Sequence, residues 1–127
     1  MLKKIAAISA LLGAICIGLG AFGAHSLKDH MEAADLQNFE TGVRYMMFHV
    51  LAILLILNNS FLKDRTKLVI SYAFLIVILF FSGSLIVIST GLIPAKQIWF
   101  ITPLGGLFFI SGWLIAGYSF FKTSFKN

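Results

Sequence analysis

Four side chains that could carry chemistry stand within or beside long apolar runs of the chain: His25, Arg44, Tyr45 and His49. Tyr45 and His49 are four residues apart, so they share a face if the segment is helical. Imidazole titrates near neutral pH, so two histidines that antiparallel helices bring to one depth could relay protons or bind a metal. These four residues therefore form the candidate polar site.

The same residues also have a structural interpretation, which we favour: a polar side chain in an apolar helix often hydrogen-bonds a neighbouring helix. His25 and Asp29 have helical ligand spacing, but a match of two residues is a weak metal motif. The sequence has no His-Glu-x-x-His motif, phosphate-binding loop or serine elbow, and Cys16 is its single cysteine. We therefore expect no metal, no cofactor and no enzymatic activity.

The composition indicates that lipid is the solvent of this chain. Hydrophobic residues make up 59% of its 127 residues and charged residues 12%, whereas about a quarter of a soluble chain is charged. The net charge is +5, but the lysines are scattered at the ends of apolar runs and form no basic patch. This distribution is typical of contacts with lipid headgroups, so we expect a lipid bilayer, and no nucleic acid, as the partner.

Four apolar segments are long enough to cross the hydrocarbon core of a bilayer, which takes about 20 helical residues. We expect a single membrane domain: an all-α integral membrane protein in which four transmembrane helices form a bundle. The expected spans are residues 5–24, 43–62, 68–89 and 98–121.

The first apolar run could also be read as a secretory signal peptide. It is longer than the usual signal core of 7–15 residues, so we expect it to remain as a span. Between the first two spans, Ser26-x-x-Asp29 resembles a capping box, which predicts a short interfacial helix over residues 26–39. A solvated loop is the alternative for this segment.

Small residues recur at positions that would share one helix face, and such stripes let two helices approach closely in lipid. We expect packing faces on the first, third and fourth spans, within the chain more often than between protomers. The residues concerned are Ala6, Ala10, Ala14, Gly18, Gly83, Gly105 and Gly112.

The basic residues predict the orientation, because Lys and Arg are in excess in cytoplasmic flanks. One side of the expected bundle has seven and the other has three, so both termini are expected in the cytoplasm. The seven are Lys3, Lys4, Lys63, Arg65, Lys67, Lys122 and Lys126, and the three are Lys28, Arg44 and Lys96.

The polar and glycine-rich pieces of the chain resemble, in order and across all four spans, the small four-span membrane proteins of the YwdK/YgdD type. That family is catalogued as a domain of unknown function and has a small eukaryotic transmembrane relative. The resemblance implies a bacterial cytoplasmic-membrane protein and supplies no activity. The matching pieces are Gly20-Ala21-Phe22-Gly23-Ala24-His25, Phe39-x-Thr41-Gly42-x-Arg44-Tyr45 with His49, Phe81-Ser82-Gly83-Ser84, Thr102-Pro103-Leu104-Gly105-Gly106 and Gly112-Trp113.

Two functional hypotheses follow. The first is a non-enzymatic accessory or assembly partner, acting in the bilayer within a larger membrane complex or as a homo-oligomer. The alternative is a small oligomeric transporter or channel with a polar cavity lined by Arg44, His49, Ser82 or Ser84. The position of these side chains in the fold discriminates between the two.

Overall fold

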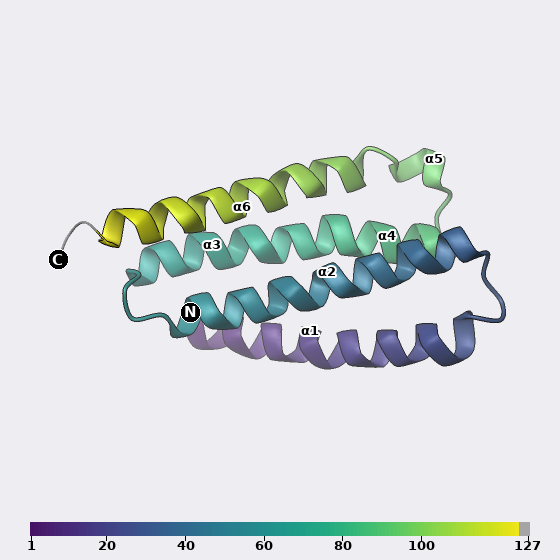
Figure 1. Ribbon diagram of the computed structural model, residues 1–127, viewed down its shortest axis with the longest axis horizontal. Helices are drawn as coiled ribbons and strands as arrows, with labels where there is room; N and C mark the ends of the chain where they lie inside the picture. Colours follow the sequence, from purple (N-terminus) through teal and green to yellow (C-terminus); the bar gives the residue numbers. More distant parts are fainter. Residues whose placement is uncertain (125–127) are drawn as a thin grey trace.

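The computed structural model describes residues 1–124 and shows long helices that run side by side (Figure 1). Two of the spans contain a π-helical turn, in which the chain accommodates one extra residue per turn. The elements are α1 (Leu2–Phe22), η1 (Gly23–Leu27), α2 (Ala33–Asn58), α3 (Asp64–Val77), η2 (Ile78–Ser82), α4 (Gly83–Ser89), α5 (Ala95–Ile98) and α6 (Ile101–Ser124).

Four continuous helical segments are long and apolar enough to cross a membrane: Leu2–Leu27, Ala33–Asn58, Asp64–Ser89 and Ile101–Thr123. The expected all-α membrane fold is confirmed. Both described ends of the chain and the turn between α2 and α3 lie at one end of the bundle (Figure 1). Lys63, Arg65 and Lys67 lie in or next to that turn, so the basic residues of the larger group gather at this end.

The second span begins at Ala33 rather than at residue 43, which changes the depth of the candidate site. The expected interfacial helix over residues 26–39 is wrong. The first span continues through η1 to Leu27, a short turn follows, and Phe39 is already inside α2. The Ser26-x-x-Asp29 capping box is also wrong, because Ser26 lies within η1 and begins no helix.

The α2 helix is the centre of the bundle, with α1 on one side and α3 and α4 on the other (Figure 1). Its buried face includes Met46, Val50 and Ile53, and these pack against Ile70 and Phe74 of α3. The α6 helix packs on α3 and η2. The core therefore extends from Ile5 and Cys16 of α1 through α2 and α3 to Ala116 of α6.

Glycines allow the closest approach of backbones, and it occurs around η2. A Cβ atom on Gly105 of α6 would lie 2.8 Å from the backbone nitrogen of Phe81, and a Cβ atom on Gly42 of α2 would lie 3.0 Å from the carbonyl oxygen of Ser82. Because Gly42 and Gly105 have no side chain, η2 fits closely between α2 and α6. Gly112 is similarly constrained, since a Cβ atom there would lie 2.6 Å from the ring of Phe74. Gly83 has no such close neighbour.

The stripe of small residues on α1 does not pack within the chain. Ala10, Ala14 and Gly18 are exposed, and Ala6 is half-buried. The helix is instead rotated so that Ile5, Ser9 and Cys16 face α2 and α3. The prediction that Ala10, Ala14 and Gly18 pack inside the bundle is therefore wrong. Their packing against another protomer stays a prediction.

Candidate functional site

His49 lies in the middle of α2 and is 3% exposed. Its Nδ1 atom is 2.8 Å from the carbonyl oxygen of Tyr45, one turn earlier. A carbonyl oxygen only accepts hydrogen bonds, so Nδ1 carries the proton and donates it. The indole N–H of Trp113, on α6, donates to His49 Nε2 at 3.0 Å. The neutral Nδ1–H tautomer thus uses both ring nitrogens, and the Trp113 bond joins α2 to α6.

Aromatic rings of α3 and α6, together with Tyr45 of its own helix, surround the imidazole. It stacks on Phe109 with ring centroids 3.7 Å apart and meets the ring of Phe74 edge-on at 5.1 Å. We call the following residues the aromatic cluster: Tyr45, His49, Phe74, Phe81, Phe109 and Trp113. The cluster joins α2, α3, η2 and α6 at the level where the glycines bring these elements together.

Tyr45 and Trp113 lie at the outer edge of the aromatic cluster, 39% and 52% exposed. Their rings therefore face the surroundings of the bundle, which at this depth are lipid. An indole N–H facing hydrocarbon needs a protein acceptor, because the bilayer core contains no water to replace it. His49 supplies that acceptor from the interior. The bond between Trp113 and His49 therefore satisfies the indole N–H inside the membrane without water.

A second polar contact joins α4 to α6 near the opposite end from the termini. The hydroxyls of Ser84 and Thr102 are 2.7 Å apart, and Ser84 also donates to the carbonyl oxygen of Phe81 at 2.9 Å. Because Ser84 has one hydroxyl proton, Thr102 is the donor to Ser84. This bond fixes the start of α6 against the end of the third span.

The structure does not bring His25 and His49 together. Gly23, two residues from His25, lies against Phe39, whereas His49 is ten residues further along α2. At 1.5 Å per residue this separates the two histidines by about 15 Å along the bundle. The expectation of two histidines at similar depth is wrong, because α2 begins earlier than the apolar pattern indicated. His25 is exposed at the end of the first span.

Arg44 is exposed on α2 and borders a shallow pocket of about 190 Å³ between α2 and the end of the first span. Glu40, one turn earlier, lines the same pocket, as do Gly20 and Gly23. Arg44 therefore lies apart from His49, on another side of the helix. Of the four candidate residues, only Tyr45 and His49 share one cluster.

The polar side chains that a transport pathway would need are distributed over unconnected places. His49, Ser82 and Ser84 are buried in the packed interior, while Arg44 faces outward. Among residues 1–124, no group of three His, Cys, Asp or Glu side chains is close enough to hold a metal ion. His49 and Ser84 each form a hydrogen bond to α6, whereas the buried hydroxyl of Ser82 has no hydrogen-bond partner.

Sequence reasoning did not identify Trp113 and Phe109 as partners of His49. A usable signal was present: the two are four residues apart on the fourth span, so they share a face, and the indole requires an acceptor. What could not be read from the sequence is which polar side chain of another span lies at the same depth.

Comparison with known proteins agrees with this fold. The family described as "Protein of unknown function (DUF423)" matches residues 19–106. The "UPF0382 membrane protein" of Haemophilus influenzae is 37% identical over 123 residues, covering 97% of this chain and 98% of the relative. The "UPF0382 membrane protein YwdK" of Bacillus subtilis is 38% identical over 116 residues, covering 87% and 88%. The "UPF0382 inner membrane protein YgdD" of Escherichia coli is 36% identical over 109 residues, covering 84% and 81%. No solved structure matches.

Proposed function

Since the chain belongs to the DUF423 family of membrane proteins of unknown function, we propose that it is a non-enzymatic accessory protein that assembles with other transmembrane helices. The contact surface is the outward face of α1. The partner is a larger membrane complex or a second copy of the chain. Both termini lie in the cytoplasm.

The observation that carries the proposal is the orientation of the small residues of α1. Ala10, Ala14 and Gly18 are exposed on one side of the helix, and apart from the neighbouring residues and backbone of α1 itself no atom lies within 4 Å of the position of a Cβ atom on Gly18. Within the chain, α1 uses its other side, with Cys16 donating through its thiol to the carbonyl oxygen of Val43. A small-residue face turned toward lipid permits close approach of another helix.

The hydrogen bonds of His49 support a non-catalytic role. Both ring nitrogens are bonded within the bundle, and the ring is stacked on Phe109. A general base or a metal ligand needs a nitrogen free to meet its substrate or ion. Both hydrogen-bonding nitrogens of His49 are thus occupied, and the bond from Trp113 joins α2 to α6.

The positions of the lysines in the fold, as well as their number, support the expected orientation of the bundle in the membrane. The start of α1, the turn between α2 and α3 and the last described turn of α6 lie at one end (Figure 1). This end carries Lys3, Lys4, Lys63 and Lys122. Such an excess of lysines marks the cytoplasmic side. Labelling of single cysteines at residues 3 and 30 of a Cys16→Ser variant in intact cells tests this: residue 30 alone should react with an impermeant reagent.

The test of assembly is chemical cross-linking and affinity purification of tagged protein from native membranes. The Ala10→Leu/Ala14→Leu variant fills the outward face of α1 and should lose its cross-linked partner. Because both positions are exposed, its helical content and melting temperature should stay close to those of the unmodified protein.

The matched control is Ser111→Leu/Gly117→Leu, which adds similar bulk to exposed positions of α6. This variant should keep the partner. The proposal fails if both variants retain the same partners, or if the protein is monomeric and alone in membranes at its native level.

A further inference from the structure

We propose that the pocket between the start of α3 and the end of α6 binds the phosphate of an anionic phospholipid, whose acyl chain follows an adjoining apolar groove on α3. This site is separate from the α1 face proposed for assembly. The residues that line it belong to the turn before α3, the start of α3 and the end of α6. These segments lie at the end of the bundle that contains both described chain ends, and α3 and α6 are on the opposite side of α2 from α1 (Figure 1).

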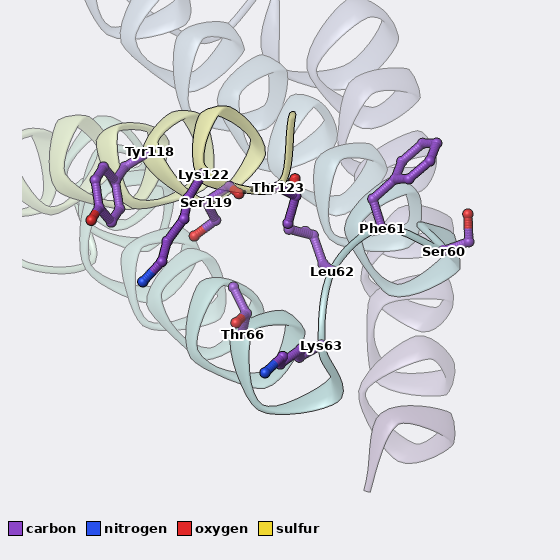
Figure 2. A pocket seen from close by; sticks show the side chains of 9 residues that line it. All are labelled: Ser60, Phe61, Leu62, Lys63, Thr66, Tyr118, Ser119, Lys122 and Thr123. Carbon is purple, nitrogen blue, oxygen red and sulfur yellow. Dashed lines mark hydrogen bonds between the residues drawn. The ribbon is translucent and has the colours of Figure 1, made fainter. Parts of the chain in front are cut away.

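The pocket has a volume of about 610 Å³ and combines cationic, hydroxyl and apolar side chains. Figure 2 shows Lys122 and Ser119 reaching from α6 toward the space above Lys63 and Thr66 at the start of α3. The nine residues that line the pocket include two lysines and no carboxylate. They are Ser60, Phe61, Leu62, Lys63, Thr66, Tyr118, Ser119, Lys122 and Thr123.

The charge of the pocket is not balanced by protein groups in the described part of the chain. Over residues 1–124 the ion pair formed is that of Lys67 with Asp64, at 3.9 Å, and neither residue lines the pocket. Lys63 is also the N-cap of α3, and its ammonium group, which only donates, cannot accept a hydrogen bond from the first amides of the helix. The first turn of α3 contains Asp64, which pairs with Lys67. Lys63 and Lys122 are the charged residues that line the pocket, and two ammonium groups favour an anion with several acceptor oxygens.

An apolar groove adjoins the pocket on the same helix. Its volume is about 520 Å³, and it runs along α3 from Arg65 past Val69, Ala73 and Ile76 to Phe108 of α6. Thr66, which lines the pocket, is followed at i+3 and i+7 by Val69 and Ala73, which line the groove. These positions lie on one side of a helix, so pocket and groove are neighbouring parts of one surface.

The position along the bundle selects a lipid as the source of the phosphate. The pocket lies where the third span begins at Asp64 and the fourth ends at Thr123, which is the depth of the headgroups. The groove lies within the third span, at the depth of the acyl chains. A cationic pocket above an apolar groove matches the two parts of a phospholipid.

The test measures lipid binding to the purified full chain in mild detergent by native mass spectrometry. The probes are dioleoyl phosphatidylglycerol, dioleoyl phosphatidylcholine and inorganic phosphate. We expect phosphatidylglycerol to bind best. The Lys63→Gln/Lys122→Gln variant should weaken its binding about tenfold or more, since one lysine near an anionic headgroup contributes about fivefold.

The control Lys3→Gln/Lys4→Gln removes the same charge from the same end but outside the pocket, and it should change the affinity less than about twofold. Ala73→Phe fills the groove without changing charge and should weaken lipid binding while leaving the circular dichroism spectrum unchanged. All three variants alter exposed or half-buried positions.

Three results would overturn the proposal. Equal loss in the two lysine variants would show nonspecific attraction to charge. Equal binding of phosphatidylcholine would exclude selection of an anionic lipid. Binding of inorganic phosphate that competes with the lipid, combined with no effect of Ala73→Phe, would assign the pocket to a soluble phosphate instead.

Discussion

The hydrogen bond between Trp113 and His49 gives the sharpest quantitative prediction. It joins two helices through one pair of side chains, with the indole N–H donating to Nε2 at 3.0 Å. The test is a double-mutant cycle with His49→Phe, Trp113→Phe and the combined variant. Phenylalanine retains an aromatic ring at each position, so the rings can still pack against Phe74 and Phe109.

Each substitution leaves a polar group in an apolar environment. His49→Phe removes the bond to Tyr45 and leaves the Trp113 N–H without its acceptor, which we expect to cost about 2 to 3 kcal/mol of unfolding free energy. Trp113→Phe leaves Nε2 unbonded and should cost about 1 to 2 kcal/mol. Hydrogen bonds between membrane helices contribute about 0.6 kcal/mol on average and about 1.7 at most. We therefore expect a coupling energy of about 1 kcal/mol, so the double variant is less destabilised than the sum of the single ones.

The assay is reversible unfolding in mixed micelles with increasing sodium dodecyl sulfate, followed by circular dichroism at 222 nm. This readout is independent of the tryptophan that is replaced. Additive single effects, with a coupling below about 0.3 kcal/mol, would refute the assignment of the bond as a clamp between α2 and α6.

Three further variants test other contacts in the same assay. Gly105→Ala places a Cβ atom 2.8 Å from the Phe81 backbone and should destabilise the protein by about 2 to 3 kcal/mol, whereas Gly18→Ala, with nothing within 4 Å, should change stability by less than about 0.5 kcal/mol; equal effects would contradict the close approach of α6 to η2. Thr102→Val removes the donor to Ser84 and should cost about 1 kcal/mol, while Thr41→Val, whose hydroxyl bonds its own helix at Gln37, serves as the control that should be nearly neutral. Asn59→Ala removes the side-chain oxygen that accepts from the amides of Phe61 and Leu62 and should cost about 1 kcal/mol; the neighbouring Asn58→Ala is the control, and an equal effect of the two would argue against this turn.

The sequence was sufficient to predict the membrane fold and its four spans, because the apolar runs are long and the charges lie between them. The start of α2 was not predictable from hydropathy. Asp35, Glu40 and Arg44 make residues 33–44 look like a solvated segment, yet the helix runs through them. A helix can extend beyond the apolar core into the headgroup region, where charged side chains reach water.

The rotation of α1 was likewise not determined by its pattern. Its small residues and its buried residues form two interleaved faces, and both are free of charge. In lipid, the inward face of a helix is marked by polar side chains as well as by small ones, and on α1 the hydroxyl of Ser9 and the thiol of Cys16 mark a different face from the alanines. Ser9 and Cys16 face inward, while Ala10 and Ala14 face outward.

His49 was identified from its type alone, since an ionisable group inside an apolar helix stands out. Its depth and its partners depend on two features that the sequence does not show: the early start of α2 and the level at which α6 passes it. The glycines near η2 determine how closely α6 approaches His49. By letting α6 approach Phe81 and Phe74, Gly105 and Gly112 bring Phe109 and Trp113 against the imidazole.

The hydrogen bonds of His49 predict a neutral imidazole that joins α2 to α6 and that neither carries protons nor binds a metal. Nitrogen-15 NMR of histidine-labelled protein in micelles at pH 7, with Trp113→Phe as the control, tests this most directly. The structure predicts a protonated Nδ1, a bare Nε2, and a shift of the Nε2 signal when the indole N–H is removed. A proton on Nε2, or an Nε2 signal unchanged by Trp113→Phe, would contradict it.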